Sequence, residues 1–214
     1  MRAGHPDMKI MDLCGARDMG IPEVDVPATR GRKAAAPDFD SRHFKHALSQ
    51  FATGVTVITT RAAGHPHANG APFVGITASS FNSVSLDPPL VLWSMATRAN
   101  SLPMFRDGSH YIINVLSASQ LDLCQRFATL KGDRFAGVDY RLSETGLPVL
   151  ANALAWFECH NRSRYDEGDH VIFVGEVERC GILDAGGEPL VFQGAQFSTL
   201  CPLDPLEQIE ARER

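Results

Sequence analysis

Short extended segments at the spacing of hairpins constrain the fold of this chain more than any other feature. They are rich in β-branched and aromatic residues, are bounded by Gly, Pro, Asn and Asp, and occupy residues 54–61, 71–80, 88–95, 110–118, 154–165, 170–183 and 189–200. A doubly wound parallel sheet would instead need a helix after almost every strand. The spacing therefore predicts a mainly β chain with peripheral helices, folded as an antiparallel barrel.

Three segments carry helical periodicity instead. Asp40 or Ser41 can cap a helix that ends before Gly54, with one apolar stripe formed by Phe44, Ala47, Leu48 and Phe51. Further helices are expected at about 99–107 and at 119–128, where Leu121, Leu123, Cys124 and Phe127 have helical spacing. These helices are too few to alternate with the strands.

The chain divides into one domain with two tails. Residues 1–37 lack periodicity and predict a poorly ordered arm, residues 38–201 form the domain, and residues 202–214 form a charged tail. With 214 residues and 44% apolar residues, the chain is long enough for one well-packed core.

Charge and cysteine content exclude several classes of function. The net charge is -5 and no run of Lys and Arg occurs, which argues against nucleic-acid binding. The five cysteines are scattered and never spaced C-x-x-C, so neither a disulfide framework nor a zinc site is indicated. The first thirty residues lack an apolar core, and no apolar run reaches the roughly 18 residues of a membrane span. We therefore expect a soluble, cytoplasmic protein without membrane contact.

A segment rich in small hydroxyl residues is the most unusual local feature. The stretch "GITASSFNSVSLDPPL", residues 75–90, carries Thr77, Ser79, Ser80, Ser83 and Ser85. Small residues leave backbone N–H groups uncovered, and such groups can hold a phosphate or the polar edge of a planar ring. Alternatively, these residues fill a strand edge and a turn before the two prolines. Neither a G-x-G-x-x-G nor a P-loop motif occurs elsewhere.

Two other polar patterns predict less. His65 and His67 lie in a Gly/Pro/Asn turn without a third ligand, so we expect a solvated hairpin tip and no metal site. Glu158 and Glu176 could form an acid/base pair, but strand alternation places them more simply on outer faces or in a dimer contact.

Four ordered motifs indicate a family. "FKHALSQFATGVTVITT", "GITASSFNSVSLDPPLVLWS", "DRFAGV" and "GDHVIFVGEV" together resemble the flavin reductase family with the FMN-binding split-barrel fold, over roughly residues 40–200. The resemblance implies an antiparallel split β-barrel, and a homodimer because family members place the flavin near the subunit interface. It also implies reduction of FMN or FAD by NADH or NADPH, with reduced flavin passed to a partner monooxygenase component.

The resemblance also implies a set of flavin contacts. Thr77, Ala78, Ser79 and Ser80 would run along the flavin ring and ribityl chain, while Asn100 and Ser101, with Arg98 nearby, would hold the phosphate. Family members often carry Asn at the position of Ala96 and Arg at that of Asn100, so the phosphate contacts differ here.

His170 is the residue that the resemblance places near the nicotinamide. Its imidazole is expected to position NAD(P)H, since hydride passes directly between the two cofactors. Phe197 matches an aromatic residue near the same pocket, or else belongs to the core. Asp133, Arg134 and Phe135 match a loop beside the flavin, or else Asp133 and Arg134 form a surface pair that caps a turn.

Two alternatives to a reductase remain open at this point. One is a flavin-binding carrier without turnover, and the other is an enzyme like pyridoxamine-phosphate oxidase, which shares the barrel but would need a more basic phosphate pocket. No arginine cluster for a 2'-phosphate is visible, which favours NADH over NADPH.

Overall fold

The structure is a computed structural model that describes residues 36–62, 64, 72–129, 132–183 and 187–201. It divides the chain into two units, Met1–Asp38 and Phe39–Arg214, and all the elements below belong to the second. The expected tail at 202–214, His65 and His67, and almost all of the expected arm lie outside the described residues.

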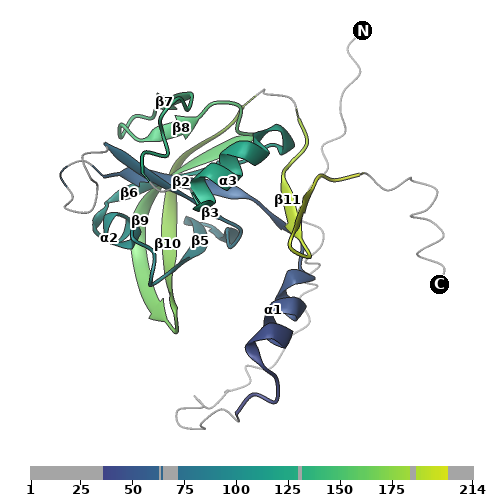
Figure 1. The fold of residues 1–214 in the computed structure, drawn as a ribbon. Coiled ribbons are helices and arrows are strands. Elements are labelled where there is room, and N and C mark those ends of the chain that lie inside the picture. Colours follow the sequence, from purple (N-terminus) through teal and green to yellow (C-terminus); the bar gives the residue numbers. More distant parts are fainter. Residues whose placement is uncertain (1–35, 63, 65–71, 130–131, 184–186, 202–214) are drawn as a thin grey trace, which may run out of the picture. The chain divides into compact units, whose positions relative to one another are not determined.

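One seven-stranded antiparallel sheet forms most of the unit, with the strand order β3-β2-β6-β9-β10-β5-β4 (Figure 1). Its strands are β2 (Thr56–Arg61), β3 (Phe73–Ala78), β4 (Asn82–Leu86), β5 (Pro89–Ala96), β6 (His110–Val115), β9 (Ala155–Glu167) and β10 (His170–Ile182). The hairpin expected at 54–80 is confirmed, since β2 pairs with β3 from Thr56–Ala78 to Arg61–Phe73. The mainly β, antiparallel prediction is therefore confirmed.

The sequence patterns missed the shortest strands. β4 was not separated from the hydroxyl-rich segment, and β7 (Tyr140–Leu142) and β8 (Pro148–Leu150) were not expected at all. Residues 189–200 were predicted as one strand but form β11 (Val191–Gln193) and β12 (Gln196–Ser198), which pair antiparallel with each other. β11 also pairs with β1 (Thr53–Gly54). Three-residue strands carry too few side chains for alternation to be recognised.

The helices are α1 (Ser41–Ser49), α2 (Leu102–Asp107) and α3 (Leu121–Thr129), the last preceded by the 3-10 turn η3 (Ala118–Gln120). Asp40 caps α1 by accepting a 2.7 Å hydrogen bond from the His43 amide, as expected. The end of α1 was predicted wrongly, because the helix stops at Ser49 and Gly54 belongs to β1. α1 buries none of its residues. Among the described residues, no helix is long and apolar enough to cross a membrane.

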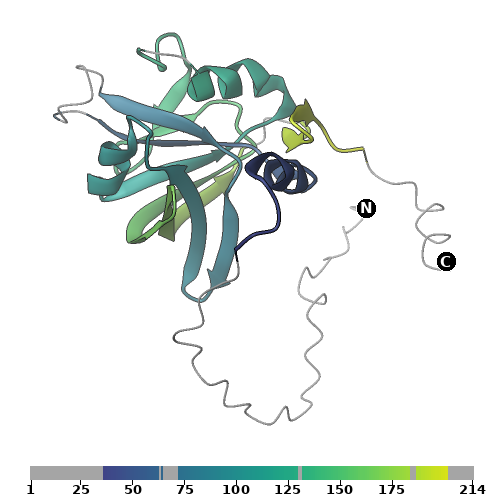
Figure 2. The same cartoon turned by 60° about the horizontal axis from the view of Figure 1, so that its bottom comes forward.

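The connection between β3 and β4 sets the curvature of the large sheet. These strands are its two opposite edges, yet only residues 79–81 separate them in the sequence. Since a residue spans at most about 3.6 Å, the sheet must curl until its edges approach each other at this point. Trp93, stacked on Phe173 with ring centroids 4.5 Å apart, lies fully buried in the core. Helix α3 packs against β3 (Figure 2).

Glu158 lies where alternation did not predict it. The side chain was expected on an outer face or in a dimer contact, but it is fully buried. Its Oε1 accepts hydrogen bonds from Ser143 Oγ at 2.5 Å and from the amide and hydroxyl of Thr145, while Oε2 faces Arg179 Nη1 at 3.3 Å. The β7–β8 connection covers what would otherwise be the solvent face of β9. Glu176, by contrast, pairs with Arg162 on the surface, as expected.

Candidate functional site

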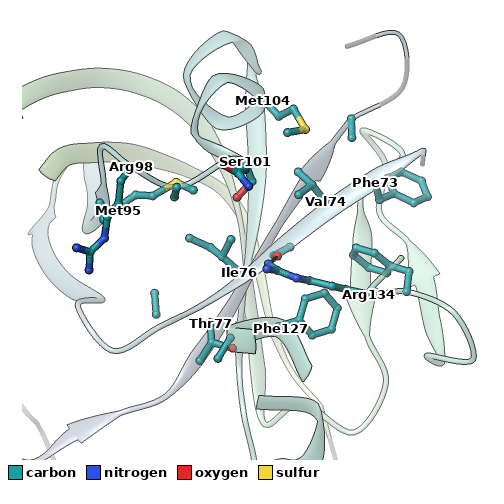
Figure 3. A pocket seen from close by; sticks show the side chains of 18 of the residues that line it. Phe73, Val74, Ile76, Thr77, Met95, Arg98, Ser101, Met104, Phe127 and Arg134 are labelled. Carbon is teal, nitrogen blue, oxygen red and sulfur yellow. Dashed lines mark hydrogen bonds between the residues drawn. The ribbon is translucent and has the colours of Figure 1, made fainter. Parts of the chain in front are cut away.

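A cavity of about 1200 Å³ opens where β3 approaches the end of β5. Its walls come from β3 and residues 79–80, from residues 94–96 and 98–101, from Met104 of α2, from Phe127 and Ala128 of α3, and from residues 132–135, with His170 at one side. Side chains from β3, α2, α3 and the 132–135 segment converge on it (Figure 3). The cavity therefore gathers segments that are far apart in the sequence.

The β3 wall is apolar with one bare position. Val74 and Ile76 contribute aliphatic surface, and Gly75 contributes backbone alone. A Cβ atom at residue 75 would lie 2.5 Å from Cε1 of Phe127, so the aromatic ring needs glycine there. Phe127 in turn packs edge-on against Phe135, with ring centroids 5.1 Å apart. A planar ring would find flat apolar contacts on this side.

The hydroxyl groups of the 77–80 segment have different partners. Thr77 donates a 2.6 Å hydrogen bond to the main-chain oxygen of Cys124 in α3. Ser80 Oγ donates to the Ser94 oxygen at 3.1 Å and accepts from the Ser94 amide at 2.9 Å. Ser79 is exposed, and its side chain makes no hydrogen bond to another described residue. All three residues and Ala78 line the cavity.

The expected phosphate contacts lie together at the start of α2. Asn100 and Ser101 line the cavity, and Ser101 is the N-cap residue of α2 but makes no side-chain capping bond. Arg98 also lines the cavity, and Figure 3 shows its side chain beside Met95 at the edge of the view. Hydroxyl, amide and guanidinium groups of this kind are suitable donors for an anionic group.

His170 lies at the first position of β10, where the β9–β10 turn meets the cavity. Its Nδ1 is 2.7 Å from Oδ1 of Asp169, and this hydrogen bond holds the pKa of the aspartate below its ordinary value. The main-chain oxygen of Asp169 accepts from the amide and hydroxyl of Thr97 at 2.9 and 3.1 Å. The turn is thereby tied to the segment that follows β5.

The 132–135 segment supplies the second cation of the cavity. Arg134 Nη1 donates to the Gly75 oxygen at 2.8 Å, and burial lowers the pKa of this arginine. Its side chain extends across β3 into the cavity (Figure 3). Asp133 accepts from the Phe135 amide at 2.9 Å, so it caps a turn, as one of the two alternatives has it. Asp133, Arg134 and Phe135 all line the cavity.

Phe197 is the predicted site residue that a single chain does not bring to the cavity. It lies in β12, packs against Phe192 with ring centroids 5.0 Å apart, and does not contribute to the cavity lining. Conversely, Met95, Met104 and Phe127 line the cavity but were not predicted as site residues. Phe127 was recognised in a helical stripe, and nothing in the local sequence distinguishes a core stripe from a pocket wall.

The lining fits a flat aromatic ligand that carries an anionic tail. Apolar surface and bare backbone flank one side, while small polar donors and two arginines lie nearby, an arrangement typical of cofactor pockets. Among the described residues, no group of three or more His, Cys, Asp or Glu side chains is placed to hold a metal ion.

Comparison with known proteins finds related sequences and structures. The sequence model of the flavin reductase like domain matches residues 48–200. The chain is 45% identical over 158 residues to the FMN reductase (NADH) SmoA of Agrobacterium fabrum, covering 74% of this chain and 85% of the relative. It is 36% identical over 164 residues to the flavin-dependent monooxygenase reductase subunit HsaB of Mycobacterium tuberculosis, covering 76% and 84%. The solved NADH:FAD oxidoreductase SgcE6 of Streptomyces globisporus, in complex with NAD and FAD fragments, superposes with a TM-score of 0.69 at 34% identity, covering 80% of this chain and 98% of that chain.

Proposed function

Because the chain belongs to the flavin reductase like domain family, we propose that it is an NAD(P)H-dependent reductase of FMN or FAD. The observation that carries this proposal is the cavity beside β3, which combines a flat apolar wall and anion-binding donors with His170 at its side. One relative is named an FMN reductase (NADH), and a structural neighbour holds NAD and FAD fragments. We propose NADH as the preferred donor, since the described cavity lining offers Arg98 and Arg134 but no arginine cluster for a 2'-phosphate.

The flavin would lie along β3 and the 77–80 segment. Val74 and Ile76 offer aliphatic surface to the ring, and Ser79 offers an uncommitted hydroxyl. Asn100 and Ser101 would bind the phosphate, with Arg98 and Arg134 balancing the negative charge of the ligand. When bound, the flavin accepts hydride from the nicotinamide, and this chemistry belongs to the two cofactors.

His170 would align the nicotinamide ring. Asp169 occupies its Nδ1, so Nε2 is the ring nitrogen that remains for a ligand. The hydrogen bonds from Thr97 to the Asp169 oxygen hold the turn in place, which restricts the imidazole before the nicotinamide arrives. The contribution of the protein is therefore orientation of two stacked rings at a short separation.

Reduced flavin would serve a separate monooxygenase component. HsaB is named as a reductase subunit of a flavin-dependent monooxygenase, and this role extends to our chain as part of the proposal. Cys124, Cys159 and Cys180 are free thiols, which is consistent with the reducing environment of the cytoplasm, the location that we propose.

We also propose that the curled sheet closes as the split barrel of the family and that the chain works as a homodimer. The three-residue link between opposite sheet edges supports closure. The apolar side chains of Phe39, Phe44, Leu48 and Phe51 are 46–73% exposed along and beside α1, an apolar row that a second copy would cover. In such a dimer, the partner subunit's Phe197 would supply the aromatic residue that family members place near the pocket. Sedimentation analysis tests the dimer, and a monomer at micromolar concentration would contradict it.

The reaction itself is tested by mixing purified protein with NADH and either FMN or FAD under anaerobic conditions and following the nicotinamide and flavin absorbance bands. We expect equal loss of NADH and of oxidised flavin. Flavin binding without NADH loss would favour a carrier module instead. Turnover of pyridoxamine phosphate without NADH would favour the oxidase alternative.

A further inference from the structure

The side chain of Thr77 connects two walls of the cavity. Its hydroxyl donates a 2.6 Å hydrogen bond to the main-chain oxygen of Cys124, a residue 47 positions away in the middle of α3. A threonine hydroxyl has a single hydrogen to donate. Since that hydrogen already points to α3, it is not available to a ligand without breaking the contact between β3 and α3.

Two neighbouring contacts hold the same walls together. The ring of Phe127 lies so close over Gly75 that a Cβ atom there would come within 2.5 Å of it. Arg134 donates to the Gly75 oxygen at 2.8 Å. Phe127 and Arg134 both line the cavity, and Figure 3 places them on the same side as Thr77. We use the name α3 wall for Phe127 of α3 together with Arg134 and Phe135, which follow this helix in the chain.

We propose that Thr77 is a positioning residue, whose hydroxyl clamps α3 against β3 and so fixes the α3 wall at the width that the flavin needs. This inference rests on the proposed function for its ligand, but the clamp itself is a property of the free protein. It differs from a direct contact between the Thr77 hydroxyl and the flavin, because the hydroxyl then acts through the backbone of Cys124. The main chain of Thr77 remains free to line the cavity.

The clamp predicts distinct behaviour for two similar substitutions. Thr77→Val keeps the shape of the side chain but removes the hydrogen-bond donor, whereas Thr77→Ser keeps the donor. In flavin-free protein, we expect Thr77→Val to speed amide hydrogen exchange in α3 roughly five- to tenfold, as for the loss of one hydrogen bond, and Thr77→Ser to restore slow exchange. FMN affinity, measured by fluorescence titration, should fall and recover in parallel.

Thr59→Val is a matched control for general loss of stability. Thr59 also donates from a strand hydroxyl to a main-chain oxygen, at 2.7 Å, but its partner is Pro148 in β8 and it does not line the cavity. We expect this variant to leave exchange in α3 and FMN affinity at wild-type values. An equal rise in exchange across the whole chain in Thr77→Val would mean that the hydroxyl supports general stability, and this outcome overturns the clamp.

A double-mutant cycle with Phe127→Leu separates the clamp from direct binding. If Thr77 acts through α3, its effect on FMN affinity depends on Phe127, and the two effects are not additive. Weaker FMN binding in Thr77→Val with unchanged exchange in α3 would overturn the proposal in favour of a direct contact. Should the wild-type protein bind no flavin, the proposed function fails, while the exchange experiment still decides whether the clamp exists.

Discussion

Glu158 and the polar groups of the cavity are two ways of placing polar atoms in one β-rich unit. Both oxygens of Glu158 have partners within the protein, from Ser143, Thr145 and Arg179, and the side chain is fully buried. In the cavity, the side chains of Ser79, Asn100 and Ser101 make no hydrogen bond within the part of the chain that the structure describes. A polar group whose partners are all internal stabilises the fold, whereas one that faces open space is available to a ligand.

The largest effect is expected when the closed network is opened. Glu158→Ala removes several hydrogen bonds to a charged group and leaves the β7–β8 connection without its anchor, which should cost about 3 kcal/mol of unfolding free energy. For a chain of this size we expect the melting temperature to fall by roughly 6–12 °C. Thermal denaturation measures it, and FMN affinity at a temperature where the variant is folded should not change.

Glu176→Gln is the control for this substitution. Like Glu158, Glu176 is paired with an arginine, which is Arg162 on β9. This pair is exposed, and exposed pairs contribute about 0–1 kcal/mol. A similar loss of stability in both variants would show that burial does not distinguish the two glutamates.

The hydrogen bonds and the ion pair of Glu158 also determine how the unfolding free energy changes with pH. Hydrogen bonds from Ser143 and Thr145 and the charge of Arg179 outweigh burial and hold the pKa of Glu158 below its ordinary value. The ionised carboxylate therefore stabilises the fold at pH values above the ordinary glutamate pKa, and this contribution is lost as the pH falls through the lowered pKa. The difference in stability between wild type and Glu158→Gln should shrink below about pH 4. A constant difference down to pH 2 would contradict this origin.

An intermediate effect is expected from a substitution in the wall of the cavity. Gly75→Ala places a methyl group where the ring of Phe127 lies, so the ring must move, at about 1–3 kcal/mol. Because Phe127 lines the cavity, we expect its displacement to lower FMN affinity about tenfold, which corresponds to about 1.4 kcal/mol of binding free energy. Gly54→Ala is the control, since a Cβ atom there meets nothing within 4 Å. Isothermal titration of both variants measures the effect, and equal affinities would exclude Phe127 as a fixed wall.

His170→Ala should affect the two proposed ligands of the cavity, NADH and FMN, differently. Loss of the imidazole removes an orienting contact with NADH but none of the proposed flavin contacts, so we expect KM for NADH to rise about tenfold, as for one lost hydrogen bond to a ring nitrogen, with FMN affinity kept. His160→Ala, at an exposed position on β9, serves as the control. Unchanged steady-state kinetics would remove His170 from the site.

The sequence predicted the long elements of the fold better than the covering ones. The sequence pattern identified β2, β3, β9 and β10, because each is a run of six or more residues rich in β-branched and aromatic side chains. It misplaced Glu158, since the two short strands that cover this side chain leave no recognisable pattern of their own. Burial of a strand face depends on which distant segment packs over it, and one sequence does not contain that information locally.

The same limit applies within the site. The segment at 77–80 and His170 were identified as neighbours of one ligand, and the cavity brings them together. The partners of their hydroxyls were not predictable, because Cys124 and Ser94 lie 47 and 14 residues away. Phe127, for its part, looked like any core residue of an amphipathic helix.

The smallest effect distinguishes two serines that line the same cavity. Ser80 is closed, since its hydroxyl both donates to and accepts from the main chain of Ser94. Ser101 is open, since it caps α2 by position without a side-chain capping bond. Ser101→Ala should therefore weaken FMN binding roughly threefold to tenfold, the value of one hydrogen bond, with an unchanged melting temperature. Ser80→Ala should lower the melting temperature and affect FMN less, because it disturbs the β5 contact before any ligand is present. If the two variants exchange these behaviours, internal partners do not decide which hydroxyls the ligand uses, and the distinction between closed and open polar groups does not hold inside the cavity.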